Sequence, residues 1–163
     1  MPLTGAKAEN FETGLLKYVF LGDTANVHTG SNLYVGLFTS NGTDPPLADT
    51  SQFAVHEPIA DNGYKRVPVS FAFSAADVEV GATAADPASI SNTNIMNFGT
   101  SNNANGWGDV TGFFITTGIG PSQGDGAESP NAIMYYGSFD TKRTVSTGDS
   151  VRINASNLTI KEK

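Results

Sequence analysis

The sequence contains no cysteine, which excludes disulfide bonds and thiolate metal sites. Stability must therefore come from packing within the chain, alone or together with contacts between subunits. Without a thiol, the sequence does not indicate the redox compartment in which the protein works.

Basic residues are scarce, which limits the partners that the protein can bind. Nine Lys and Arg stand against sixteen Asp and Glu, giving a formal net charge of −7 at pH 7. The adjacent basic pairs are Lys65-Arg66 and Lys142-Arg143. Because binding to a phosphate backbone needs a larger basic cluster, we expect no nucleic-acid partner.

Long apolar runs and sequence repeats are absent too. The first ten residues hold no apolar run of signal-peptide length, and no later segment approaches the ~18 apolar residues of a membrane span. We therefore expect synthesis in the cytoplasm and no membrane partner. No heptad, Gly-X-Y or β-helix period recurs, so the sequence encodes no fibrous shaft.

Turn-forming and strand-forming residues dominate instead. The 18 glycines suit turns, as do the many Asn, Ser and Thr, while Val, Ile, Phe and Tyr suit strand interiors. We predict an all-β fold, an antiparallel β-sandwich or jelly roll with one short N-terminal helix. The 163 residues suit a single domain over residues 11–163, preceded by an N-terminal arm over residues 1–10. The predicted strands cover residues 33–39, 64–73, 77–80, 90–98, 107–116, 132–139 and 150–160.

The one predicted helix spans residues 11–21, with Asn10 as its N-cap and Gly22 ending it in the left-handed conformation. Apolar side chains recur at helical spacing, and Leu16 and Phe20 widen the apolar surface. We therefore expect the helix to pack against the sheets. Its length and its lack of a basic face argue against a membrane anchor.

Two predicted strands carry further expectations. In residues 64–73, apolar and other residues alternate, which is typical of a half-buried strand. Pro68 cannot donate a hydrogen bond to a neighbouring strand, so this strand belongs at a sheet edge or contains a bulge. In residues 90–98, we expect the packing to come from Ile90, Ile95, Met96 and Phe98.

The sequence offers little chemistry for catalysis. His28 and His56 both lie in predicted loops. Glu57 and Glu79 lie near predicted strand ends, but nothing singles them out as a pair with separated pKa values, which glycoside hydrolysis requires. We predict that the protein is not an enzyme and has no cofactor.

A metal site finds equally weak support. His56, Glu57 and Asp61 lie close together in the sequence, yet they match neither a zinc spacing nor the calcium loop. Gly124-Asp125-Gly126 is too short to be specific. We predict no bound metal.

Contacts with other proteins are the more promising function. Residues 41–63 form a long loop containing both adjacent prolines, and such loops are commonly functional. Trp107 opens an apolar strand, which favours core packing over stacking on a sugar ring. The predicted contact surface comprises Pro45, Pro46, His56, Glu57, Trp107 and Asp125.

Several segments, taken in chain order, carry a resemblance to a known family. Their order resembles that in a family of small tailed-bacteriophage virion proteins commonly labelled tail fibre proteins, over nearly the whole chain. The segments are residues 15–20, residues 33–39, Glu57 with residues 63–67, Trp107-Gly108, Tyr136-Gly137, residues 144–153 and residues 158–160.

The resemblance implies a virion structural protein made in the host cytoplasm. Our leading hypothesis is a homo-oligomeric head decoration (cement) protein that binds the major capsid protein and stabilises the shell. The alternative is a tail-fibre knob or adaptor that joins a tail structural protein and binds a host receptor or glycan. In that case Trp107 and the tyrosines near the loops of residues 102–106 and 118–130 would form the recognition surface.

Overall fold

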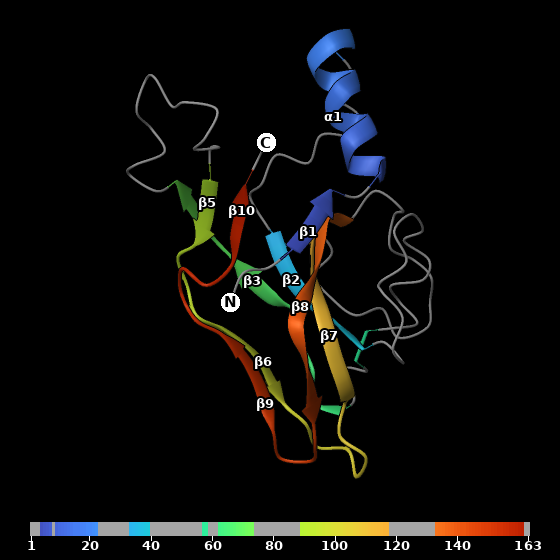
Figure 1. The fold of residues 1–163 in the computed structure, drawn as a ribbon, viewed down its shortest axis with the longest axis vertical. Helices are drawn as coiled ribbons and strands as arrows, with labels where there is room; N and C mark the ends of the chain where they lie inside the picture. The colour runs from blue at the N-terminus through green and yellow to red at the C-terminus, as the bar shows by residue number, and fades with distance from the viewer. Residues whose placement is uncertain are drawn as a thin grey trace.

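The computed structural model describes residues 4–7, 9–22, 33–39, 57–58, 62–73, 89–117 and 133–161. Within these ranges the regular structure is mostly β-strand, and all strand pairs are antiparallel (Figure 1). This confirms the predicted all-β fold with one short N-terminal helix. The elements are β1 (Thr4–Lys7), α1 (Glu9–Leu21), β2 (Leu33–Thr39), β3 (Val67–Val69), β4 (Phe71–Phe73), β5 (Ser89–Asn92), β6 (Met96–Thr100), β7 (Gly108–Thr116), β8 (Ile133–Val145), β9 (Ser150–Ile153) and β10 (Thr159–Lys161).

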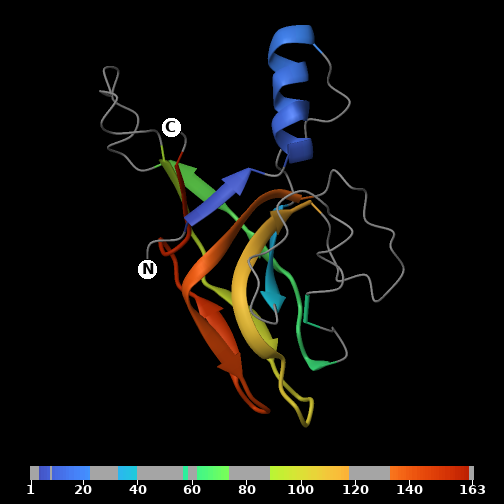
Figure 2. The ribbon, with the colours of Figure 1, turned by 45° about the vertical axis from the view of Figure 1, so that its right-hand side comes forward.

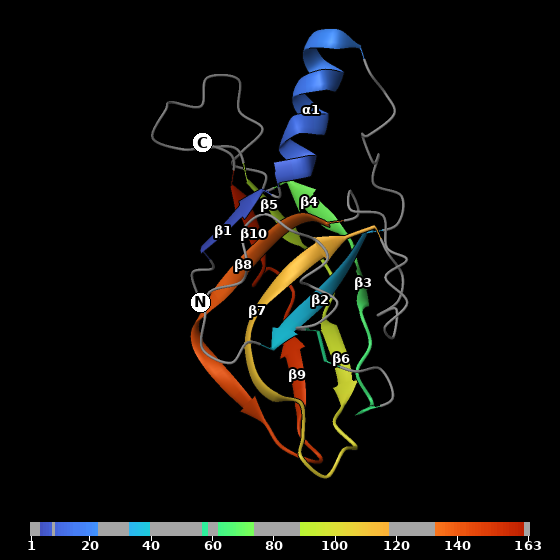
Figure 3. The ribbon, with the colours of Figure 1, turned by 90° about the vertical axis from the view of Figure 1, so that its right-hand side faces the viewer.

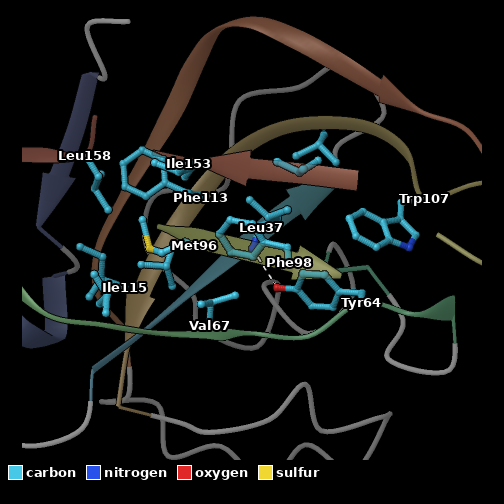
Figure 4. Packing of buried hydrophobic residues seen from close by; sticks show 14 of the residues in the cluster. Leu37, Tyr64, Val67, Met96, Phe98, Trp107, Phe113, Ile115, Ile153 and Leu158 are labelled. Atoms are coloured by element: carbon cyan, nitrogen blue, oxygen red, sulfur yellow. Dashed lines mark hydrogen bonds between the residues drawn. The ribbon is translucent and has the colours of Figure 1, made fainter. Parts of the chain in front are cut away.

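The strands form three sheets that enclose the main core. The largest has the order β1-β8-β7-β2-β3, the second has the order β10-β5-β4, and β6 pairs with β9. Buried side chains of β2, β3 and β7 meet those of β6 and β9 in one cluster. Figure 4 shows Met96 and Phe98 of β6 among Leu37, Phe113 and Ile153. The core therefore lies between the five-stranded sheet and the smaller sheets.

Strands β2 and β7 are buried on both faces, which explains their continuous apolar sequences. Leu37 belongs to the main core, whereas the neighbouring Phe38 and Phe114 of β7 form a second cluster with Ile133 and Tyr136. The rings of Phe38 and Phe114 stack with centroids 5.1 Å apart. A Cβ on Gly36 would come within 2.2 Å of the Phe114 ring, so this position needs a glycine.

The edge position predicted for Pro68 is confirmed. Strand β3 ends the five-stranded sheet, and Pro68 is exposed between buried Val67 and Val69. The segment predicted as one strand is divided at Ser70, however, and β4 joins the three-stranded sheet. At this corner the Ser70 amide donates to Asn94 Oδ1 over 3.0 Å. The chain thereby passes from one sheet to the other.

Other expectations need correction. Ile95 is 55% exposed in the turn between β5 and β6, so it does not join Met96 and Phe98 in the core. Strand β8 continues through the predicted connection as far as Val145, because β7 supplies a pairing partner that far. The predicted strand over residues 77–80 lies outside the described residues.

The N-terminal residues are partly ordered against the chain itself. Strand β1 pairs with β8 from Thr4 opposite Ser138 to Lys7 opposite Tyr135. Asn10 lies inside α1, so it is not the N-cap that we expected. The division into an arm and a single domain stays a prediction.

Candidate interaction surface

Helix α1 stands at one end of the molecule and points away from the sheets (Figures 1 and 2). It ends as the sequence predicts. Gly22 has a φ of 68°, in the left-handed region that favours glycine, and its amide donates to the Tyr18 carbonyl over 3.2 Å. The end of the helix is therefore well defined.

The apolar side chains of α1 are largely exposed, contrary to the expected packing against the sheets. The exposed fractions are 53% for Leu16, 46% for Tyr18, 59% for Val19, 75% for Phe20 and 76% for Leu21. The helix contacts strand β8, and its buried position is Gly14. An exposed apolar cluster of this kind typically marks a contact with another molecule.

Glu57, Tyr64 and Arg66 form a buried polar network at the edge of the five-stranded sheet. Arg66 Nε donates to Glu57 Oε1 over 2.8 Å, and Arg66 Nη2 donates to Glu57 Oε2 over 2.7 Å. The Tyr64 hydroxyl donates to Glu57 Oε1 over 2.7 Å and accepts the Leu37 amide hydrogen over 2.9 Å. This hydroxyl therefore continues the β2 pairing just beyond the last residue pair of β2 and β3.

The network is shielded from water. The side chains of Glu57 and Arg66 are each 3% exposed, and the Arg66 guanidinium carbon lies 5.0 Å from the centre of the Phe114 ring. Burial, and next the neighbouring Glu57 charge, raise the pKa of Tyr64 well above its usual value. Because each Glu57 oxygen accepts at least one hydrogen bond, this carboxylate fixes the chain and is not presented to a partner.

Trp107 packs against Tyr64, one of the three residues of this network. It is 7% exposed, its indole Nε1 donates to the Asn62 carbonyl over 2.8 Å, and its ring meets Tyr64 edge-on at 5.6 Å (Figure 4). The geometry of Trp107 therefore supports core packing, the role that the sequence favours over stacking on a sugar ring. Its buried ring has no free face for a sugar.

Of the predicted contact residues, the structure brings together Glu57 and Trp107, which both contact Tyr64. Pro45, Pro46, His56 and Asp125 lie outside the described residues, as do His28, Asp61 and Glu79. The contact surface as a set stays a prediction. In the described ranges, no three His, Asp or Glu side chains gather as metal ligands would.

A sequence comparison gives the family. The family described as "Podophage GP4 fiber I protein gp80" matches residues 7–161. The chain belongs to this family. It is therefore a phage virion structural protein of the fibre type. A comparison with curated proteins gave no match.

The end of this fibre-family protein opposite α1 is a tip formed by the loops of residues 101–106 and 146–149 (Figure 3), whose exposed polar residues are Asn, Ser, Thr and Asp. Its two loops are joined by hydrogen bonds. The Ser101 amide donates to the Asp149 carbonyl over 2.8 Å, and the Thr147 hydroxyl donates to the Asn103 carbonyl over 2.6 Å. The tip is thus a fixed surface of small polar side chains.

Two further features of the fibre-family sequence bear on its candidate sites. Arg66 directly precedes Val67 and is buried as Val67 is. A buried charge requires a partner. The segment Gly120-Pro121-Ser122-Gln123-Gly124 has the Gly-x-Ser-x-Gly spacing of a hydrolase nucleophile elbow. It lies outside the described residues, and the next described element after it is strand β8.

The described part of the chain contains no helix that is both long and apolar enough to cross a membrane.

Proposed function

We propose that this fibre-family protein is a knob or adaptor of the phage tail that attaches through its α1 end to tail structural protein. The observation that carries the proposal is the family match, which spans residues 7–161 and therefore covers α1 and strands β2 to β10. The absence of a shaft-forming repeat supports a knob or adaptor over a fibre shaft. Head decoration, our leading hypothesis from sequence, finds no such support.

Two chemically different ends support this function. The α1 end offers apolar side chains such as Phe20 for attachment, while the tip offers backbone and small polar groups held in place by hydrogen bonds. A surface of the second kind suits recognition of a hydrogen-bonding ligand, such as a host receptor or glycan. The net charge of −7 argues against nucleic acid as the partner.

Immunogold labelling or cryo-EM of virions decorated with antibody fragments against the purified protein tests this proposal. The label should appear on the tail. A label spread over the capsid would overturn the proposal and favour head decoration. Antibody that has first been absorbed with purified protein is the control, and it should give no label on either part.

We also propose that the protein acts without catalysis. The support is that Glu57, one of the acids considered for glycoside cleavage, is engaged by Arg66 and Tyr64. Purified protein should leave host surface glycans intact in a degradation assay. Turnover that is lost in Glu57→Gln or Glu79→Gln, with folding retained by circular dichroism, would contradict the proposal.

A further inference from the structure

Strand β1 and helix α1 are joined to the rest of the described fold mainly through strand β8 (Figure 3). Strand β1 lies at one edge of the five-stranded sheet and pairs with β8 from Thr4 to Lys7. Helix α1 begins two residues after β1 ends, and it also contacts β8. None of the described side chains of α1 belongs to either core cluster. The two elements are therefore attached chiefly through a single neighbouring strand.

Helix α1 has little buried surface to hold it in place. Among residues 12–21, Gly14 is buried, Leu15 is half-buried and the others are exposed. A glycine has no Cβ and so contributes no side chain to the contact. A helix of 13 residues is only marginally stable in water by itself. Helix α1 therefore depends on its contact with β8, and detachment of β1 from β8 should also remove the support of the helix.

The two edges of the five-stranded sheet are protected in different ways. At the β3 edge, Pro68 has no amide hydrogen, and the Asn94 side-chain amide donates to the Pro68 carbonyl over 3.0 Å. These backbone groups are therefore closed to another strand. At the opposite edge, the β8 segment over residues 135–138 contains no proline and pairs with β1. Strand β1 thus covers backbone groups that would otherwise form an open pairing edge.

We propose that β1 and α1 form a releasable strap, which leaves β8 as one unit while strands β2 to β10 stay folded. The structure shows the closed state. In the open state, β8 presents the backbone donors and acceptors of residues 135–138, which suit pairing with an extended protein segment. The strap therefore controls access to this edge. The inference goes beyond the proposed function and does not rest on it, because the opening involves this chain alone and is independent of its place in the virion.

Strand β8 keeps its own place when β1 leaves. On its other side it pairs with β7, from Ile133 opposite Thr116 to Val145 opposite Gly108. Ile133 belongs to the second core cluster, and Val145 belongs to the main core. Because these contacts lie outside the strap, its release is a local opening and not an unfolding of the whole protein.

Hydrogen–deuterium exchange of the purified full chain, followed by mass spectrometry, tests the strap. Peptides covering β1 and α1 should exchange at least about 100-fold faster than peptides covering β2 and β7, after correction for the intrinsic exchange rates. The amides of β1 and α1 should also be protected to the same extent, because the two elements open in one step. Protection of β1 and α1 equal to that of β2 and β7 would overturn the inference.

An engineered disulfide tests whether β1 and α1 open together. The chain has no cysteine, so Thr4→Cys with Ser138→Cys provides a single pair at facing positions of β1 and β8. Facing residues of antiparallel strands have Cα atoms about 4.5–5.5 Å apart, which a disulfide spans. The oxidised form should slow exchange at least about tenfold in both β1 and α1, and the reduced form should exchange as the wild type does. Slower exchange in β1 alone would show that the helix opens separately, which would overturn the inference.

A second disulfide is the matched control. Asp109→Cys with Thr144→Cys joins β7 to β8, again at facing positions, and does not involve the strap. Its oxidised form should leave the exchange of β1 and α1 unchanged. If both disulfides slowed exchange in α1 equally, α1 would exchange through unfolding of the whole protein, and the strap would not exist as a separate unit.

Discussion

Two regions of the molecule depart from the usual placement of charge outside and apolar side chains inside, and they do so in opposite ways. The Glu57–Arg66 pair is charged and buried, whereas α1 carries Phe20 and Leu21 largely in solvent. Inside the fold, the Glu57 and Arg66 charges compensate each other across a 2.7 Å ion pair. On α1 the described residues leave these apolar side chains exposed.

The comparison separates stability from assembly. The buried pair links a loop to the edge strand, and its loss should affect folding. The helix surface contributes little to folding and should affect association. Substitutions in the buried pair should therefore lower the free energy of unfolding, and substitutions on the helix surface should leave it almost unchanged.

The largest effect is expected for Arg66→Ala. Removing the guanidinium leaves the Glu57 carboxylate buried without its charged partner, which should lower the free energy of unfolding by about 3–5 kcal/mol. Urea unfolding followed by Trp107 fluorescence measures this change. Lys65→Ala is the matched control, since Lys65 is an exposed neighbour and should change stability by about 0.5 kcal/mol or less.

A double substitution shows whether Arg66→Ala loses stability because it leaves the buried Glu57 carboxylate without a charged partner. Glu57→Leu with Arg66→Met removes both charges and should recover much of the loss seen in Arg66→Ala, because apolar replacements avoid the desolvation cost. The Tyr64 hydroxyl would still lose one partner. If the double variant were as unstable as the single one, packing and not an isolated charge would explain the effect.

A smaller effect is expected for Tyr64→Phe. This change leaves the Leu37 amide without its acceptor and takes one hydrogen bond from Glu57, which should cost about 1–3 kcal/mol. Tyr18→Phe, at a 46% exposed position, is the matched control and should be neutral. Equal stability of the two variants in urea would show that the hydroxyl network does not stabilise the edge strand.

The raised pKa of Tyr64 also predicts that the folded protein loses stability at alkaline pH. Burial raises its pKa in the folded protein well above the ordinary value of 10.0, so the unfolded chain gives up this proton first. The contribution is fully present below pH ~10 and falls as the pH rises above that value. Tyr64→Phe should lose less stability than the wild type over this range. A parallel decline in both proteins would show that other groups cause it.

Local chemistry explains which parts of the fold the sequence predicts well. Pro68 lacks an amide hydrogen, and that alone places its strand at a sheet edge. Gly22 ends α1 because glycine tolerates the left-handed conformation. The division of the strand at Ser70 is different, because it depends on Asn94, 24 residues away. Such a contact leaves no local pattern.

The candidate sites show the same limit. Glu57 was expected on a contact surface, but its pairing with Arg66, nine residues away, turns it into an internal link. The apolar character of α1 was recognised correctly, while the expectation that α1 packs against the sheets was wrong. Apolar side chains on every side of a helix indicate burial, but they do not say whether the same chain provides it.

The smallest effect on folding should come from Phe20→Ala, and it gives the sharpest test of the comparison. Phe98→Ala, at a fully buried position, should cost about 3–5 kcal/mol, whereas Phe20→Ala should cost about 0.5 kcal/mol or less at concentrations where the monomer dominates. A large cost of Phe20→Ala in the monomer would mean that the chain itself covers α1, and the helix would then be part of the core and not a surface for assembly.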